Sequence, residues 1–321
     1  YARLADVPVL EPSSPDEARR MTRAAFDLSE EVGLPVILRI TTRLAHMRGP
    51  VTLGDIQPIR PPPAEPVRDP RRFVNMPANA PANRKRHFEA MARAKRISET
   101  SPFNVVLGEG KVGIVASGIA SAYALDALAE LGLADQVAVL RLGMTWPVPE
   151  KMLGRFLRWK RRILVAEELE PFLEHEVELT AFRARRRPVV LGKRSGHLPL
   201  TGEFSPVLMT GAVAALTGAP WTPPPPPAQS SIAVPPRPPV ICAGCVHRAA
   251  FYAAKVATGG KAIFENDIGC YTLGYGPPYH QADHLVCMGG GINLAASLSR
   301  QTEQPVFAYI GDSTFFHSGV T

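Results

Sequence analysis

A glycine–aspartate pair at the end of an apolar segment is the first place in this sequence where chemistry can be expected. Residues 304–310 have the composition of a buried strand, and Gly311, Asp312 and Ser313 follow directly. In open α/β sheets, ligands bind where the strands end. Glycine lets a phosphate approach the backbone, a carboxylate suits Mg²⁺, and serine adds a hydroxyl and an amide. The pattern predicts a site for a metal-bound phosphate.

Two further strand-like segments in the last quarter end in polar or glycine-rich loops. Residues 262–265 precede Asp267, Gly269 and Cys270, and residues 284–287 precede a glycine run that starts at Gly289. The carboxyl ends of parallel strands meet at one edge of a sheet. We therefore expect these loops to converge with the Gly311–Asp312 turn on one site.

All four cysteines, Cys242, Cys245, Cys270 and Cys287, also lie in this quarter. The pair Cys242 and Cys245 has the spacing of a zinc or iron–sulfur ligand pair, but the other two are single and widely spaced. A redox-active dithiol is a second interpretation of that pair, and an inert buried thiol is the simplest one for Cys287. A secreted disulfide scaffold would contain more cysteines in a shorter chain, so we expect reduced thiols and a cytoplasmic location.

The elements that would position these residues belong to an α/β fold. Strand-like segments at 112–117, 136–142, 162–166 and 189–191 alternate with helix-like segments at 120–131, 149–159 and 172–183. This order predicts βαβ units in a doubly wound parallel sheet. Near the start, a helix from Pro15 capped by Ser14 and a strand at 35–41 indicate the end of another α/β domain. The strand leads into a polar turn at 41–46, which is either a site or a locally hydrogen-bonded loop.

Proline-rich stretches divide the chain, whose 321 residues predict at least two domains. Residues 58–83 read as an extended connector before a basic helix at 84–98, and residues 220–239 contain five consecutive prolines. The predicted divisions are residues 1–57, a connector at 58–102, a domain at 103–219, a linker at 220–239 and a domain at 240–321.

Charge and composition restrict the classes of function. The net charge of +7 comes mainly from arginine-rich patches at 155–162 and 183–187, which we interpret as solvated helix faces because no nucleic-acid motif accompanies them. No apolar run approaches the length of a membrane span. Gly118 after Ser117 indicates a tight turn, because the spaced glycines of a dinucleotide site are missing. Glu167 and Glu168 are interpreted as a solvated acidic loop rather than a catalytic pair.

Four motifs in the last quarter resemble, in order and spacing, the thiamine-diphosphate-binding part of the large subunit of the indolepyruvate:ferredoxin oxidoreductase family. They are Cys242-Ala-Gly-Cys-Val-His-Arg248, Asp267-Ile-Gly-Cys-Tyr-Thr-Leu-Gly274, Cys287-Met-Gly289 and Ile310-Gly-Asp-Ser-Thr-Phe-Phe-His-Ser-Gly319. Stretches that begin at Tyr1, Val9, Leu38, Arg72 and Glu167 also resemble this family, so the resemblance covers nearly the whole chain. Ala243 and Val246 stand where the family usually has prolines, which leaves every polar group of the motif in place.

The resemblance implies a thiamine-diphosphate-binding fold with several parallel-sheet domains and a transketolase-C-like middle domain. Residues 1–57 would end a pyrimidine-binding domain, residues 103–219 would be the middle domain, and residues 240–321 would be a truncated diphosphate-binding domain. By resemblance, Asp312 is the Mg²⁺ ligand, and His247 lies near the reacting carbon or supports a residue that does. The other residues expected to surround the cofactor are Cys245, Asp267, Gly269, Cys270, Gly289, Gly311 and Ser313.

The implied activity is oxidative decarboxylation of aryl pyruvates such as indolepyruvate to acyl-CoA, with ferredoxin as the electron acceptor. Coenzyme A, ferredoxin, and a smaller β subunit or its fused equivalent would be the partners, without nucleic acid or membrane. A second Mg²⁺ ligand, the pyrimidine-activating glutamate and the cysteines of [4Fe–4S] clusters lie outside this sequence. Since it also starts at Tyr1, we expect an internal fragment that is inactive alone. The alternatives are a non-oxidative thiamine-dependent decarboxylase and a non-catalytic zinc-stabilised α/β module.

Overall fold

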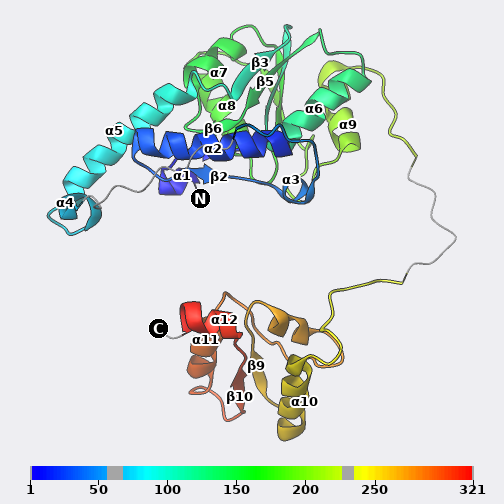
Figure 1. The fold of residues 1–321 in the computed structure, drawn as a ribbon. Coiled ribbons are helices and arrows are strands. Elements are labelled where there is room, and N and C mark those ends of the chain that lie inside the picture. The colour runs from blue at the N-terminus through cyan, green and yellow to red at the C-terminus, as the bar shows by residue number, and fades with distance from the viewer. Residues whose placement is uncertain (1, 56–67, 226–234, 320–321) are drawn as a thin grey trace. The chain divides into compact units, whose positions relative to one another are not determined.

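The computed structural model describes residues 2–55, 68–225 and 235–319 (Figure 1). The chain forms two compact units, unit 1 from Tyr1 to Pro226 and unit 2 from Pro227 to Thr321. The division falls in the second proline-rich stretch. Parts of both predicted linkers, residues 58–67 and 226–234, lie outside the described residues. The described part of the first is not fully extended, because it contains the helix α4 (Pro70–Phe73) and the start of α5 (Ala80–Ser98). Both helices have a proline in the first turn, where a proline is tolerated.

Unit 1 is built around a five-stranded sheet with the strand order β3-β5-β4-β7-β8. Strands β5, β4, β7 and β8 run parallel to one another, and the edge strand β3 is antiparallel to β5. The strands are β3 (Asn104–Leu107), β4 (Val112–Ser117), β5 (Val137–Leu142), β7 (Arg162–Ala166) and β8 (Val189–Leu191). The prediction of an α/β fold with a parallel sheet is confirmed, and β3 is an element that the sequence pattern did not indicate.

Helices cover both faces of this sheet, as Figure 1 shows. Alternate residues of β4 face opposite ways, so Ile114 and Ala116 pack under one helix pair and Val115 under the other. The first pair is α6 (Gly118–Glu130) with α9 (Pro206–Thr217), and the second pair is α7 (Glu150–Leu157) with α8 (Phe172–Arg183). Because both faces are covered, β4, β5 and β7 are mostly apolar and their sequences do not alternate with polar residues.

The N-terminal segment of the chain shares a second sheet with the middle of unit 1. In the order β2-β1-β6, β1 pairs in parallel with β2 and antiparallel with β6. The elements are α1 (Ala2–Ala5), β1 (Val9–Leu10), α2 (Pro15–Val32), β2 (Ile37–Leu38), α3 (Thr42–His46), α4 (Pro70–Phe73), α5 (Ala80–Ser98) and β6 (Met144–Trp146). The predicted cap is present, since the Ser14 side chain accepts a hydrogen bond from Glu17 N. The polar turn expected at 41–46 is instead the short helix α3.

Unit 2 has a two-stranded parallel sheet of β9 and β10. Its elements are α10 (Val246–Thr258), β9 (Ile263–Glu265), the 3₁₀ helix η1 (Cys270–Tyr275), α11 (Gly290–Leu298), β10 (Val306–Ala308), α12 (Asp312–Thr314) and the π-helical turn η2 (Phe315–Gly319). Phe251, Phe264 and Tyr309 form its core, with Ile241 and Ala254. The strand predicted at 284–287 is reduced to one parallel bridge between His284 and Glu265.

All four cysteines are free. Within the part of the chain that the structure describes, no helix is both long and apolar enough to cross a membrane.

Glu167 and Glu168 are buried, so the predicted solvated acidic loop is wrong. Their side chains stand at the carboxyl end of β7 with 4% and 7% exposure. The Glu167 carboxylate accepts hydrogen bonds from Leu173 N at 2.7 Å and Glu174 N at 2.8 Å, which caps the start of α8. The Glu168 carboxylate accepts one from Phe204 N at 2.9 Å. Both carboxylates therefore satisfy buried backbone donors.

We expect Glu167 to make unit 1 less stable as the pH rises. Burial raises the pKa of Glu167 to about 7, although the two backbone hydrogen bonds oppose this. The folded chain then holds a proton that the unfolded chain has released, so stability is lost from about pH 4.5 to about pH 7, by at most about 3 kcal/mol. The three tryptophans, Trp146, Trp159 and Trp221, all lie in unit 1, so their fluorescence in urea reports its unfolding.

The variant Glu167→Gln should flatten this pH dependence. It loses one acceptor and should be less stable than the unmodified chain at pH 5, with the difference shrinking by pH 8. The exposed neighbour variant Glu170→Gln is the matched control and should keep the original slope. Parallel curves for Glu167→Gln and the unmodified chain between pH 5 and pH 8 would contradict the assignment.

Candidate functional site

Three loops of unit 2 meet at the carboxylate of Asp267. This residue follows β9 and is 2% exposed. Its Oδ1 accepts a hydrogen bond from Gly289 N at 3.0 Å, and its Oδ2 accepts one from Gly311 N at 3.0 Å. One side chain therefore holds together the loop after β9, the loop before α11 and the loop after β10.

The hydrogen bonds around Asp267 favour the ionised form of its carboxyl group. Burial by itself would raise the pKa of Asp267, but hydrogen bonds from the Thr314 hydroxyl and from the Gly289, Gly311 and Ile268 amides hold the pKa below its usual value. Since both carboxylate oxygens already accept hydrogen bonds from the protein, Asp267 organises the site rather than reaching into it. Thr314, which is buried, is part of this hydrogen-bonded group, and the sequence pattern did not single it out, although it stands two positions after Asp312.

The glycine run at 289–291 lets a helix begin directly against the end of β9. Gly289 has φ of 80°, a left-handed conformation that favours glycine, and α11 starts at the next residue. A Cβ on Gly291 would lie 2.9 Å from the Asn266 carbonyl oxygen. The first amides of a helix have no acceptor within it, and they attract phosphate groups. The start of α11 is thus suited to an anion.

Asp312 and Ser313 lie beside this helix start and are exposed. Asp312 is joined directly to Gly311, whose amide Asp267 holds, and it opens the short helix α12. Within residues 2–55, 68–225 and 235–319, no three His, Cys, Asp or Glu side chains are grouped so as to hold a metal ion. A metal bound at Asp312 would therefore complete its shell with ligand oxygens and water, which is how Mg²⁺ usually binds phosphates.

A second group of predicted residues gathers at the start of α10. The Cys245 Sγ and His247 Nδ1 atoms are 3.1 Å apart. The His247 ring meets the Tyr271 ring edge to face, with centroids 4.4 Å apart. Burial and the nearby Cys245 raise the pKa of Tyr271. The structure therefore brings Cys245 and His247 together and adds Tyr271, which directly follows Cys270.

The segment that includes η1 connects the two groups. The Thr272 hydroxyl donates to the Asp267 carbonyl at 3.0 Å and accepts from Gly269 N at 3.2 Å. The Asn266 side chain donates to the Tyr271 carbonyl at 2.7 Å. Gly269 and Cys270 are exposed on this connecting segment. Both groups of predicted site residues are thus tied to the carboxyl end of β9.

Two buried acceptor atoms at the end of β9 lack a hydrogen-bond donor among the described residues. They are Glu265 Oε2 and Asn266 Oδ1. The other carboxylate oxygen of Glu265 lies 2.6 Å from His284 Nδ1, and this hydrogen bond raises the pKa of His284. Unpaired buried acceptors cost free energy, so this end of β9 is suited to an additional polar partner.

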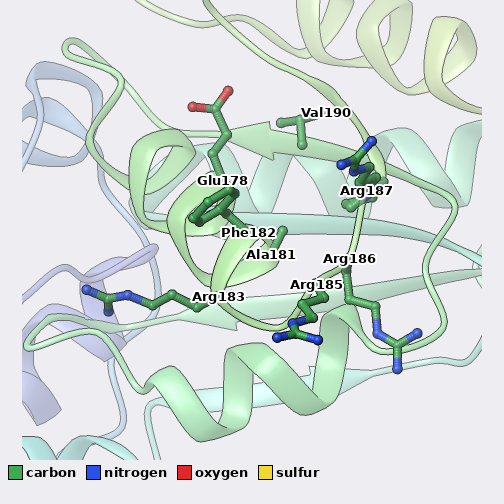
Figure 2. Close-up of a pocket in the computed structure, with 9 residues that line it drawn as sticks. Glu178, Ala181, Phe182, Arg183, Arg185, Arg186, Arg187 and Val190 are labelled. Atoms are coloured by element: carbon green, nitrogen blue, oxygen red, sulfur yellow. The ribbon is translucent and has the colours of Figure 1, made fainter.

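The arginine-rich segment 183–187 lines a different depression, of about 880 Å³, at the end of α8. Figure 2 shows that the guanidinium groups of Arg183, Arg185, Arg186 and Arg187 point in different directions around Phe182. An anion site needs donors that converge on one point. This depression therefore fits the solvated surface that the sequence suggested better than a binding site.

The fold and site together define a mixed α/β protein with a strand-edge site suited to a metal-bound phosphate. No protein-family model matches the chain. It is 42% identical to the indolepyruvate oxidoreductase subunit IorA of Methanothermobacter thermautotrophicus over 334 residues, which cover 100% of this chain and 52% of that protein. It is 40% identical to IorA of Thermococcus kodakarensis over 356 residues, with coverage of 100% and 53%.

The chain belongs to the family of these indolepyruvate oxidoreductase IorA subunits. It spans about half the length of the curated relatives that it matches. Among solved structures, a 2-oxoglutarate:ferredoxin oxidoreductase from Magnetococcus marinus is similar with a TM-score of 0.44 and 18% identity, covering 65% of this chain and 42% of that one. That similarity is too low to carry weight.

Proposed function

We propose that unit 2 holds the diphosphate and Mg²⁺ of thiamine diphosphate. The observation that carries this proposal is the pair of hydrogen bonds that the Asp267 carboxylate accepts from Gly289 N and Gly311 N, at 3.0 Å each. Those bonds place the start of α11 beside the exposed Asp312. In this arrangement the amides of the first turn of α11 and Gly289 receive the diphosphate, Asp312 binds Mg²⁺, and Ser313 shapes the turn.

The second group of residues would form the wall around the rest of the cofactor. Thiamine diphosphate, when bound, supplies the electron sink needed to remove CO₂ from a 2-oxo acid. Cys245, Gly269 and Cys270 would line that wall, while His247 offers a polar contact near the reacting carbon. The contact between Cys245 and His247 at 3.1 Å fixes the orientation of the imidazole, which a group that holds or moves a proton requires.

The substrate and partners follow from the family. The relatives are named indolepyruvate oxidoreductases, which supports aryl pyruvates as the substrates. We further propose coenzyme A as the acyl acceptor and ferredoxin as the electron acceptor, as the resemblance of the motifs implies. The complete enzyme would add [4Fe–4S] clusters and a smaller β subunit, in the cytoplasm, without nucleic acid or membrane. Unit 1 would then contribute the end of a pyrimidine-binding domain and a transketolase-C-like domain.

The reaction can be tested with the full-length protein that contains this chain. Under anaerobic conditions, indolepyruvate and coenzyme A should yield CO₂, the aryl-acetyl thioester, and two electrons that reduce a viologen dye or ferredoxin. Release of CO₂ with an aldehyde and no reduced acceptor would instead identify a non-oxidative decarboxylase. Failure to bind thiamine diphosphate, together with zinc that is lost in the variant Cys242→Ser, would support the metal-stabilised module.

A further inference from the structure

Unit 1 contains a cavity of about 640 Å³ that the proposed thiamine site does not use. It lies between the strands β1 and β2 on one side and the carboxyl ends of β4 and β7 on the other, where Ser117 and Glu167 stand. Its size is that of a pocket for a small molecule.

The cavity occupies the position in the sheet where ligands bind in α/β folds. In the strand order, β4 and β7 are neighbours in the middle of the sheet. The chain continues from β4 to β5, which lies toward one edge of the sheet, and from β7 to β8, which lies toward the opposite edge. Between two strands whose connections run in opposite directions, the loops separate and open a crevice at the carboxyl edge. At the rim, Leu169 has φ of 68°, a strained conformation for a residue with a side chain, and such strain is common at binding sites.

The walls of the cavity favour an aromatic ligand. Trp146 and Phe172 line it with their rings edge to face, at a centroid distance of 5.8 Å, and Ile37 and Leu38 complete the apolar part. The indole Nε1 of Trp146 is buried and has no acceptor among the described residues. A buried indole N–H usually finds a partner, so a ligand with an acceptor group suits this wall.

The cavity also carries charges of both signs. Its carboxylates belong to Glu11, Glu167, Glu168 and Glu170, and its guanidinium groups belong to Arg3 and Arg39. Arg39 pairs with Glu11 and donates to the Glu168 carbonyl at 3.1 Å. Burial raises the pKa of Glu11 and of Glu167, which is a frequent property of functional sites. The exposed carboxylate of Glu170, at the rim of the cavity, favours a ligand with a cationic group besides its acceptor.

From these features we infer that the cavity binds an aromatic amino acid. The ring would lie against Trp146 and Phe172, the ammonium group would face the carboxylates, and the ligand carboxylate would accept from Trp146 Nε1. Exposed Glu170 has the carboxylate best placed to meet an ammonium group without disturbing a buried hydrogen bond, because Glu167 and Glu168 already accept from backbone amides.

Three ligands with one phenyl group separate these contributions in a calorimetric titration of the chain. L-phenylalanine carries both charged groups, 2-phenylethylamine lacks the carboxylate, and 3-phenylpropionate lacks the ammonium group. L-phenylalanine should bind at least about tenfold more tightly than either of the others, since each missing polar contact costs about 1.4 kcal/mol or more. No thiamine diphosphate is added, so the result is independent of the function proposed for unit 2.

Two variants test the named contacts, with Glu178→Gln, outside this cavity, as the control. Trp146→Phe keeps an aromatic wall but removes the N–H donor. It should therefore lower the affinity for L-phenylalanine and leave the affinity for 2-phenylethylamine unchanged. Glu170→Gln should lower the affinity for both amines and leave the affinity for 3-phenylpropionate unchanged. Absence of saturable binding, equal affinity for all three ligands, or an equal loss for all three in Trp146→Phe would overturn the inference.

Discussion

Replacing Asp312 with asparagine is expected to weaken the Mg²⁺-dependent binding of thiamine diphosphate by about a hundredfold or more, because Mg²⁺ relies on one or two carboxylates for its protein contacts. The affinity can be measured by calorimetry on the full-length protein at saturating Mg²⁺. Asp312 is exposed, so the unliganded protein should lose less than about 0.5 kcal/mol of unfolding free energy.

The neighbouring variant Ser313→Ala is the matched control for Asp312→Asn. Ser313 is exposed on the same short helix and carries no charge, so removing its hydroxyl should lower the affinity for thiamine diphosphate far less. Equal affinity of Asp312→Asn and the unmodified protein would remove Asp312 from the metal site. A large loss of stability in Asp312→Asn would show that its role is structural instead.

The change Asp267→Asn should have the opposite profile, with a large effect on unit 2 even without cofactor. An asparagine offers one acceptor oxygen, so one of the two glycine amides would face an NH₂ group. Leaving a buried donor unpaired and removing a charged hydrogen bond should cost about 2–4 kcal/mol in unfolding free energy. Hydrogen exchange of the Gly289 and Gly311 amides measures this directly, and both should exchange faster by at least about thirtyfold.

A suitable control for this change is Asp283→Asn in the same unit. The Asp283 carboxylate accepts one hydrogen bond, from Phe264 N at 2.7 Å, but the residue is exposed, so the amide oxygen can replace it at small cost. Unchanged exchange at Gly289 and Gly311 in Asp267→Asn would show that these loops do not depend on that carboxylate. The depressed pKa of Asp267 also means that its contribution is lost in acid, as the pH falls below about 3.8 and through the folded pKa.

Much of unit 1 could be predicted from sequence because its helices and strands differ in period and follow one another regularly. The limits of β7, α8 and β8 agree with the predicted segments. Strand β3 escaped because it is an edge strand of only four residues, and its apolar run from Val105 to Leu107 is too short to show a period. The helix α9 was missed although its signals were present, namely the cap Ser205, Pro206 and the terminal Gly218.

The site was predictable only in its local parts. The Gly311–Asp312 turn follows a strand-like segment, and this local order indicates a ligand-binding edge. The role of Asp267 depends on hydrogen bonds to residues 22 and 44 positions away, which no local pattern reveals. The burial of Glu167 was missed for a related reason, since its partners Leu173 and Glu174 form the start of the next helix. Charged residues at a strand end look solvated until that helix is placed.

The position of the metal tests the central claim most directly. A crystal structure of the full-length protein with thiamine diphosphate and Mn²⁺ in place of Mg²⁺ would locate the ion by its anomalous scattering. We expect one ion coordinated by the Asp312 carboxylate and by diphosphate oxygens, with the diphosphate at the start of α11 and both Asp267 hydrogen bonds intact. An ion and diphosphate bound away from Asp312 and Gly289, or no thiamine diphosphate bound at all, would contradict the account.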